Sequence, residues 1–336
     1  MQRRQVQAID LMKFVCSILV IIVHTHPFYE KLPDVGFVFS NILGRIIIPF
    51  FFISSGYFMQ KGLKGKSNSY FKKYIHRIIK LYLIWSFICL PAGYLLVNNV
   101  IQLKGFEWVI ALIAGLFYAG TYYHLWYMAA LIFAMIFCYL WLKKFSMKSL
   151  LILGGILLMI GCVETYHALF KNTLLENPLH IYFSIFHTTR NGLFFGTLYV
   201  ALGLYIAQTD LDLQIQHRFI KSVFFFVLLI IEAFTTRIHH WAIDYNMYFM
   251  AVPFTFYWFC WLLNTQCPWK LNYKSLREYS TIIYFSHGMY LEYVPWLLNI
   301  FGFASWFDHG LFRITSVLTL TLFTSVLIKR YIPILK

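Results

Sequence analysis

The chain has 336 residues, of which 60% are hydrophobic and 12% are charged. A soluble domain carries about twice that charged fraction, so the surplus apolar surface must face lipid. The formal net charge of +15 does not indicate nucleic-acid binding, because Lys and Arg cluster in short segments between apolar runs, as in cytoplasmic loops of membrane proteins. The composition therefore excludes a soluble globular protein and predicts an all-α, polytopic integral membrane protein.

Ten segments have the hydrophobic composition expected of transmembrane helices. They are residues 9–26, 35–59, 78–97, 124–142, 149–163, 190–207, 222–236, 247–263, 280–300 and 311–328. The basic residues of 61–80, 143–148, 266–279 and 329–330 fall on one side of this arrangement, so the positive-inside rule places both termini in the cytoplasm. We expect one transmembrane domain, 1–336, in a bacterial cytoplasmic membrane.

Residues 108–118 are apolar but too few to span a bilayer, which takes roughly 20 residues. We expect them to form an interfacial or re-entrant helix on the outer side. The six cysteines lie in or beside apolar runs without metal-ligand spacing, so we interpret them as hydrophobic fillers and expect no metal site.

The first apolar segment carries a polar residue near each end. Asp10 and Lys13 lie near its start, and His24 follows after ten residues that do not ionise. Eleven positions in an α-helix turn through about 1,100°, so Lys13 and His24 share one face about 16 Å apart. Charged residues in a lipid-buried helix usually face a cavity or a partner. The pattern predicts a site that extends across the membrane.

Polar residues in or beside the other apolar segments are candidates for the rest of the site. They are Arg45, Ser55, His124, Arg190, Asn191, Glu232, Tyr284 and His287. Structural roles are open alternatives for several of them. Arg45 can reach the outer surface, Ser55 can serve helix packing, Glu232 can pair with Arg237, and His287 can bond a neighbouring helix.

Several of these residues occur in motifs that resemble the membrane acyltransferase-3 family. That family has an Arg-x10-His pair on its first helix; here Lys13 stands in place of the arginine and His24 completes the pair. Its second motif, FFxxSG, is present at residues 51–56. Further family-like segments are His124-Leu-Trp-Tyr and Tyr284-x-x-His287. The resemblance covers the whole chain, and ten spans is the usual core of the family.

The resemblance implies transfer of an acyl group, expected to be acetyl, from cytoplasmic acyl-CoA to a hydroxyl or amine of an envelope sugar, lipid or cell-wall component. His24 is then the expected general base, since an imidazole has a suitable pKa. Expected donor-binding residues are Lys13, Asp10, Arg45 and Ser55. Expected residues of the acceptor pocket are His124, Arg190, Asn191, Glu232, Tyr284 and His287.

Within the family, some segments look most like the membrane half of the serine racemases of vancomycin resistance, which suggests a role in cell-wall modification and antibiotic resistance. These segments begin at Arg45, Tyr123, Thr189 and Asn246. Such racemases continue into a cytoplasmic domain that uses pyridoxal phosphate. Residues 1–336 contain no such domain, so we expect either a stand-alone relative or part of a longer protein.

Two alternatives to acyl transfer stay open at this point. The first is a module that binds or transports a small polar solute, such as L-serine, for a cytoplasmic racemase-like partner. The second is a membrane anchor with a degenerate site, which the replacement of arginine by Lys13 keeps open.

Overall fold

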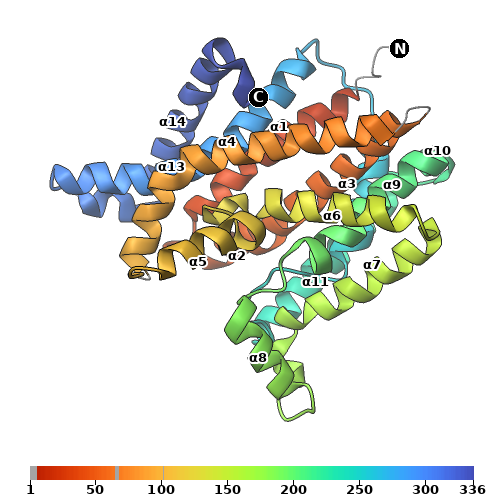
Figure 1. The fold of residues 1–336 in the computed structure, drawn as a ribbon, viewed down its shortest axis with the longest axis horizontal. Helices are drawn as coiled ribbons and strands as arrows, with labels where there is room; N and C mark the ends of the chain where they lie inside the picture. The colour runs from red at the N-terminus through yellow and green to blue at the C-terminus, as the bar shows by residue number, and fades with distance from the viewer. Residues whose placement is uncertain (1–5, 65–67, 101) are drawn as a thin grey trace. The chain divides into compact units, whose positions relative to one another are not determined.

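The computed structural model describes residues 6–64, 68–100 and 102–336, and within these ranges the regular secondary structure is all helical (Figure 1). Among the described residues, eight segments are long and apolar enough to cross a membrane. They are Gln7–Thr25, Pro33–Leu63, Ser69–Asn98, Glu107–Leu142, Met147–Glu164, Gly192–Thr209, Arg218–Ile238 and Gly310–Tyr331. The prediction of an all-α, polytopic membrane protein is confirmed.

Each of the ten predicted spans contains a helix. The two outside the eight segments are α12 (Ala251–Leu263), which has 13 residues, and α13 (Tyr273–Ile300), which has 28. α13 begins well before the predicted start at Ser280, because Asn272 caps it and its polar first turns extend the helix beyond the apolar segment. The number of spans and the sidedness of the chain stay predictions.

The described chain forms two compact units. Unit 1 comprises Met1–Ile47, His76–Ala129 and Gln266–Lys336, and unit 2 comprises Ile48–Ile75 and Ala130–Thr265. Three helices contribute residues to both units: α3 (Gly44–Leu63), α4 (Asn68–Val100) and α6 (Trp126–Leu142).

The other elements belong to one unit each. Unit 1 contains α1 (Gln7–Thr25), α2 (Pro33–Val38), η1 (Phe39–Leu43), α5 (Glu107–Ala114), η2 (Gly115–Ala119), η3 (Tyr123–Leu125), α13, η7 (Ala304–Asp308), α14 (Gly310–Tyr331) and η8 (Pro333–Leu335). Unit 2 contains α7 (Met147–Gly161), η4 (Cys162–Glu164), η5 (His167–Phe170), α8 (Glu176–Phe186), η6 (Gly192–Gly196), α9 (Thr197–Thr209), α10 (Leu211–Gln214), α11 (Arg218–Ile238) and α12.

In unit 1, α1 packs against both α13 and α14. Ile21 of α1, Ile283 of α13 and Val317 of α14 meet in a core cluster and are fully buried. Phe14 and Tyr279 pack against the same cluster. This contact fixes the orientation of α1 relative to α13, and with it the face of α1 that carries Lys13 and His24.

In unit 2, glycines let helices approach closely. A side chain at Gly56 of α3 would collide with the backbone of Val200 in α9, and one at Gly203 would collide with the backbone of Ile53. Small residues of this kind are common where membrane helices touch, because they allow backbone contact. Gly56 is the last residue of the FFxxSG motif, so part of that motif serves α3–α9 packing.

The segment expected to lie at the outer interface forms α5 followed by the π-helical turn η2. Gly120, with a φ of 82°, ends it before the chain enters η3 and α6. Tyr82 of α4 donates its hydroxyl hydrogen to the backbone carbonyl of Leu116 at 2.9 Å, which joins η2 to α4. The helix is confirmed, and its depth in the membrane stays a prediction.

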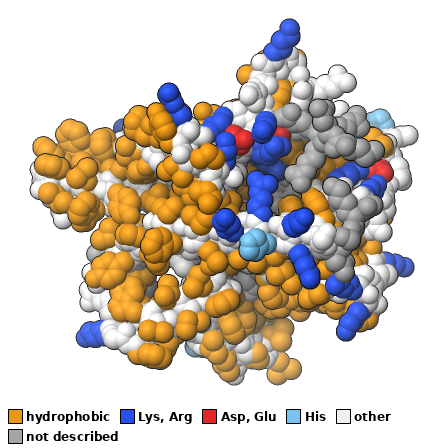
Figure 2. Space-filling view, turned by 45° about the horizontal axis from the view of Figure 1, so that its top comes forward, with side chains coloured by type: hydrophobic (Ala, Val, Ile, Leu, Met, Phe, Trp, Pro, Cys, Tyr) orange, Lys and Arg blue, Asp and Glu red, His pale blue; other side chains and the backbone are white. Residues whose placement is uncertain are grey.

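Large hydrophobic side chains are exposed on many helices. On α11, for example, Val223, Phe224, Val227 and Ile231 each expose about half of their surface. Figure 2 shows hydrophobic side chains over much of the visible face, with Lys and Arg gathered on parts of it. A surface this apolar is expected to contact lipid. All six cysteines are unpaired, and five are buried, as expected of apolar fillers.

Candidate active site

Helix α1 presents the two predicted first-helix residues from one continuous helix. It runs unbroken from Gln7 to Thr25, so Lys13 and His24 keep the helical spacing of about 16 Å. Both side chains are half-buried. Ser280 of α13 donates a hydrogen bond to the backbone carbonyl of Lys13 at 2.8 Å, which fixes this end of α1 against α13.

The polar end of α1 near Lys13 contains an ion pair. Asp10 is 1% exposed, and its carboxylate accepts hydrogen bonds from Nη1 of Arg277 at 3.2 and 3.4 Å. Arg277 was missing from the predicted site, because its position in a basic loop is equally typical of positive-inside anchoring. Asp10, Lys13 and Arg277 together place two cations and one carboxylate at this end.

At the other end of α1, three imidazole rings form a cluster. The rings of His24 and His287 are stacked, with centroids 5.4 Å apart and an interplanar angle of 21°. The ring of His124 lies 4.8 Å from that of His287. His24 comes from α1, His124 from η3 and His287 from α13, so three segments far apart in sequence meet here. We call His24, His124 and His287 the imidazole cluster.

Backbone carbonyls determine which nitrogen carries the proton in two of these rings. Nδ1 of His287 is 3.1 Å from the carbonyl oxygen of Ile283, and Nε2 of His124 is 3.1 Å from that of Phe285. A carbonyl oxygen only accepts, so these nitrogens are the protonated ones. In the neutral rings, Nε2 of His287 and Nδ1 of His124 then carry lone pairs. Neither nitrogen has a hydrogen-bond partner in the described structure, and both are buried.

Aromatic side chains enclose the cluster. The ring of Tyr123 meets that of His24 edge-on at 5.0 Å. Tyr284 donates its hydroxyl to the backbone carbonyl of His124 at 2.6 Å. Tyr122 donates to the carbonyl of Gly288 at 2.9 Å and lies 3.0 Å from the Glu292 carboxylate. Tyr122 and Tyr123 were missing from the predicted site, because aromatic residues at this depth are also typical of the interfacial belt.

Arg45 lies near the C-terminal end of α1, since a side chain at the preceding residue, Gly44, would collide with that of Val23. Its Nη2 donates to Oδ1 of Asn41 at 3.2 Å. Nδ1 of His26, the residue that follows α1, lies 3.1 Å from Oγ of Ser40 in η1. Arg45 is therefore at the opposite end of α1 from Lys13.

The remaining predicted site residues belong to unit 2. Asn191 caps η6, its Oδ1 accepting hydrogen bonds from the backbone N–H groups of Leu193 and Phe194 at 3.0 and 2.9 Å. Arg190 donates from Nη1 to Oδ1 of Asn246 at 3.1 Å. Ser55 is half-buried in α3.

Glu232 anchors the chain that leads into α12. Its carboxylate accepts the backbone N–H groups of Phe249 and Met250 at 2.7 and 2.8 Å, and the hydroxyl of Tyr166. The predicted span starting at residue 247 was therefore wrong at its N-terminal end: α12 begins at Ala251, because these N–H groups bond to Glu232 in a non-helical loop.

Glu164 is a buried carboxylate that the sequence did not single out. It accepts hydrogen bonds from the hydroxyl and backbone N–H of Thr189 at 2.7 and 2.6 Å, and from Nδ2 of Asn246 at 2.5 Å. Thr188 also donates to it, at 2.9 Å. Asn246 in turn accepts a hydrogen bond from Arg190. Glu164 therefore holds both Thr189, which precedes Arg190, and Asn246, which binds the Arg190 guanidinium.

Comparisons with known proteins agree with the family resemblance seen in the sequence. A family model described as an acyltransferase domain, acyltransferase-3, matches residues 6–330. Two proteins of Enterococcus faecalis, each named amino-acid racemase, are 27% and 25% identical over 88% and 73% of this chain. A serine/alanine racemase of Enterococcus gallinarum is 27% identical over 67% of it. No solved structure matches the chain significantly.

The alignments cover only part of those relatives. The matched region is 43%, 34% and 32% of the three racemases, so this chain spans less than half the length of the curated relatives it matches. The family model, by contrast, covers nearly the whole chain. The chain therefore belongs to the acyltransferase-3 family of acyltransferase domains.

Proposed function

We propose that this protein transfers an acyl group, with acetyl the expected group, from cytoplasmic acyl-CoA to a hydroxyl or amine of an envelope sugar, lipid or cell-wall component. The observation that supports this most is the position of His24 within the imidazole cluster, one helix length from Lys13, in a chain of the acyltransferase-3 family.

In this proposal His24 acts as the general base. Its imidazole removes the proton from the acceptor hydroxyl or amine as the acceptor oxygen or nitrogen attacks the thioester carbonyl carbon. The carbon–sulfur bond then breaks, and the CoA thiolate leaves with the proton that His24 returns. An imidazole suits both proton transfers because its ordinary pKa is close to neutral pH.

The neighbours of His24 favour the imidazolium that forms during this reaction. The ring face of His287 is stacked on His24 at 5.4 Å, and aromatic faces within about 6 Å attract cations. The lone pair on Nε2 of His287 belongs to the same buried cluster and adds negative potential. We propose that His124 and Tyr284 hold His287 and the start of α6 in place around it.

The polar end of α1 is the proposed donor end. Lys13 and Arg277 present two cations there, and Asp10 neutralises one of them. A lysine is a point charge without the bidentate fork of arginine, so Lys13 is expected to bind a donor phosphate or pantetheine carbonyl through a single hydrogen bond. Arg45 lies at the opposite end of the helix, so we propose that it binds the acceptor, although it was expected from the sequence to bind the donor.

The predicted pocket residues Arg190, Asn191 and Glu232 belong to unit 2, and their part in acceptor binding stays a prediction. Within unit 2, Arg190 donates to Asn246, Asn191 holds the backbone of η6, and Glu232 holds the loop before α12. Ser55 stays a proposed donor-binding residue. We propose that residues 1–336 act as one transmembrane domain of a bacterial cytoplasmic membrane, with a role in cell-wall modification and antibiotic resistance.

A second candidate function is binding or transport of a small polar solute, such as L-serine, for a cytoplasmic racemase-like partner or domain. The observation that favours it is the printed name of the relatives, which are racemases of amino acids or of serine and alanine. Solute flux into liposomes without coenzyme A would support this candidate.

The test uses purified protein in nanodiscs with labelled acetyl-CoA and an envelope extract. We expect His24→Ala to reduce release of the CoA thiol by at least about 100-fold, the usual contribution of a general base, and Lys13→Ala to weaken acetyl-CoA binding. His76→Ala and Lys80→Ala, which change exposed residues of α4, serve as matched controls and are expected to have no effect. Absence of acetyl-CoA binding at millimolar concentration by folded protein would overturn acetyl transfer.

A further inference from the structure

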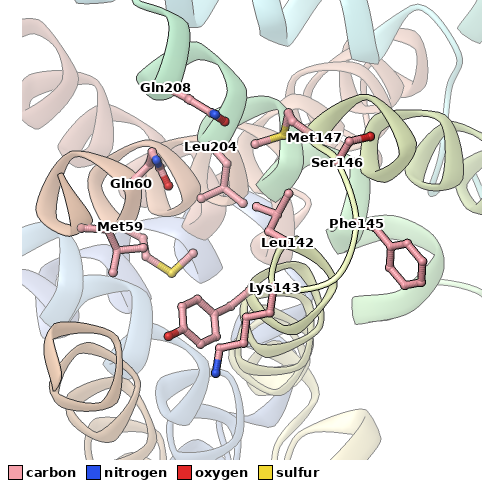
Figure 3. A pocket seen from close by; sticks show the side chains of 11 residues that line it. Met59, Gln60, Leu142, Lys143, Phe145, Ser146, Met147, Leu204 and Gln208 are labelled. Atoms are coloured by element: carbon pink, nitrogen blue, oxygen red, sulfur yellow. The ribbon is translucent and has the colours of Figure 1, made fainter. Parts of the chain in front are cut away.

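A hollow in unit 2 has a lining that differs from the imidazole cluster. Its volume is 470 Å³, within the roughly 300–1,000 Å³ of small-molecule sites. Its walls come from the end of α3, the α6–α7 connection and the end of α9 (Figure 3). Two of these segments, the end of α3 and the α6–α7 connection, adjoin or contain the basic residues of 61–80 and 143–148, which the positive-inside rule places in the cytoplasm.

The lining combines apolar and polar groups. Met59 and Leu204 are among its apolar residues, and Gln60, Gln208 and Lys143 bring hydrogen-bond donors. In Figure 3, Gln60 extends from α3, Gln208 from α9 and Lys143 from the end of α6. Amide and ammonium donors beside apolar side chains suit a ligand with a negatively charged, oxygen-rich head and an apolar body.

Side chains next to the hollow are of the kind common at the depth of lipid headgroups. The indole N–H of Trp141 donates to Oγ of Ser149 at 3.1 Å, while its ring contacts that of Phe145 at 4.5 Å. An apolar ring with a satisfied polar end is typical of the membrane interface. Lys144 and Lys148, in the same connection, are exposed.

The charge around the hollow favours an anion. Asp210, just beyond α9, accepts hydrogen bonds from Nζ of Lys61 at 2.5 Å and of Lys64 at 3.2 Å, so two cations offset one carboxylate. Lys143 adds a further positive charge. Its Nζ lies 4.8 Å from the ring centroid of Tyr139, a contact that leaves its N–H groups available to an anion.

We propose that this hollow binds the phosphate headgroup of an anionic phospholipid from the inner leaflet. Lys143 and the two glutamine amides bind the phosphate and glycerol oxygens, and the first acyl carbons rest on Met59 and Leu204. Basic pockets between helices on the cytoplasmic side are suited to such headgroups. The proposal is independent of the acyl acceptor and of the role of His24.

The test measures thermal unfolding of the full chain in detergent while phosphatidylglycerol, phosphatidylcholine or soluble glycerol phosphate is added. A ligand that binds the folded state raises its unfolding temperature. We compare Lys143→Gln, which removes the charge, Gln208→Trp, which fills the hollow without changing charge, and Lys144→Gln, a matched cation outside the lining. Lys143, Lys144 and Gln208 are exposed, so none of the substitutions creates a cavity in the core.

We expect phosphatidylglycerol to stabilise the wild type more than phosphatidylcholine does. Its half-saturating concentration should rise about fivefold or more in Lys143→Gln, the effect of about 1 kcal/mol per lysine, and its effect should vanish in Gln208→Trp. Equal losses in Lys143→Gln and Lys144→Gln with none in Gln208→Trp would mean general surface attraction and overturn the site. Stabilisation by glycerol phosphate without any by the lipid would overturn the lipid source.

Discussion

At the scale of single residues, Gly288 determines how closely η3 approaches α13. A side chain at this position would collide with the ring of His124 and with the ring of Tyr122 at 2.7 Å. Gly288 therefore lets both rings lie directly on α13, where Tyr122 bonds the Gly288 carbonyl. The imidazole cluster depends on this missing side chain as much as on its three histidines.

Gly288→Ala is accordingly expected to destabilise the protein by about 1–3 kcal/mol, the usual cost of overpacking a buried contact, and to lower any His24-dependent activity. Thermal unfolding and thioester turnover, measured together, check this. The matched control is Gly155→Ala in α7, where an added methyl group meets open space and should be neutral or slightly stabilising. Equal behaviour of the two variants would contradict the contact.

At the scale of elements, one buried and one half-buried carboxylate hold the loops of unit 2. Glu164 binds the turn that contains Thr188 and Thr189 and, through Asn246, the loop before α12. Glu232 binds the end of that loop. These two residues hold the long connections between helices in fixed positions. Hydropathy identifies the helices but not these loop contacts.

Glu164→Gln is expected to lower the free energy of unfolding by about 2–3 kcal/mol, because an amide cannot accept all the hydrogen bonds that the carboxylate accepts, and buried donors are left unsatisfied. Thermal unfolding in detergent gives the direction and the size. The control, Glu107→Gln, changes an exposed glutamate and should stay within about 0.5 kcal/mol of wild type. A wild-type unfolding temperature for Glu164→Gln would contradict this role of the carboxylate.

The helices themselves follow from apolar length, which is why each of the ten predicted spans contains one. The ends of the helices do not follow from apolar length, because caps and loop contacts determine them. Asn272 caps α13 ahead of its apolar segment, and Glu232 binds backbone N–H groups that would otherwise belong to the start of α12. Helix α8 was not predicted, since its 11 residues are too few to span a bilayer and only spanning segments were sought by hydropathy. The stacking of His24 on His287 also lay beyond the sequence, because each histidine has an equally good local explanation and only the packing of α1 on α13 brings them together.

At the scale of the whole molecule, the proposed acyl transfer requires the donor end of α1 to face the cytoplasm. Cys267 provides a probe of sidedness, because it is the one partly exposed cysteine of the six and lies in the loop expected inside. A membrane-impermeant maleimide is expected to label the protein in inside-out vesicles and not in intact cells, with Cys267→Ser abolishing the labelling. Labelling of Cys267 from outside would reverse the topology.

The central claim is that an acyl group passes from cytoplasmic acyl-CoA to an envelope acceptor by way of His24. The most direct measurement loads right-side-out membrane vesicles with labelled acetyl-CoA and counts label in envelope material outside them. Vesicles with wild-type protein should transfer label, and vesicles with an equal amount of His24→Ala should transfer at least about 100-fold less. Equal transfer by the two proteins, or wild-type transfer no greater than that of vesicles lacking the protein, would contradict the claim.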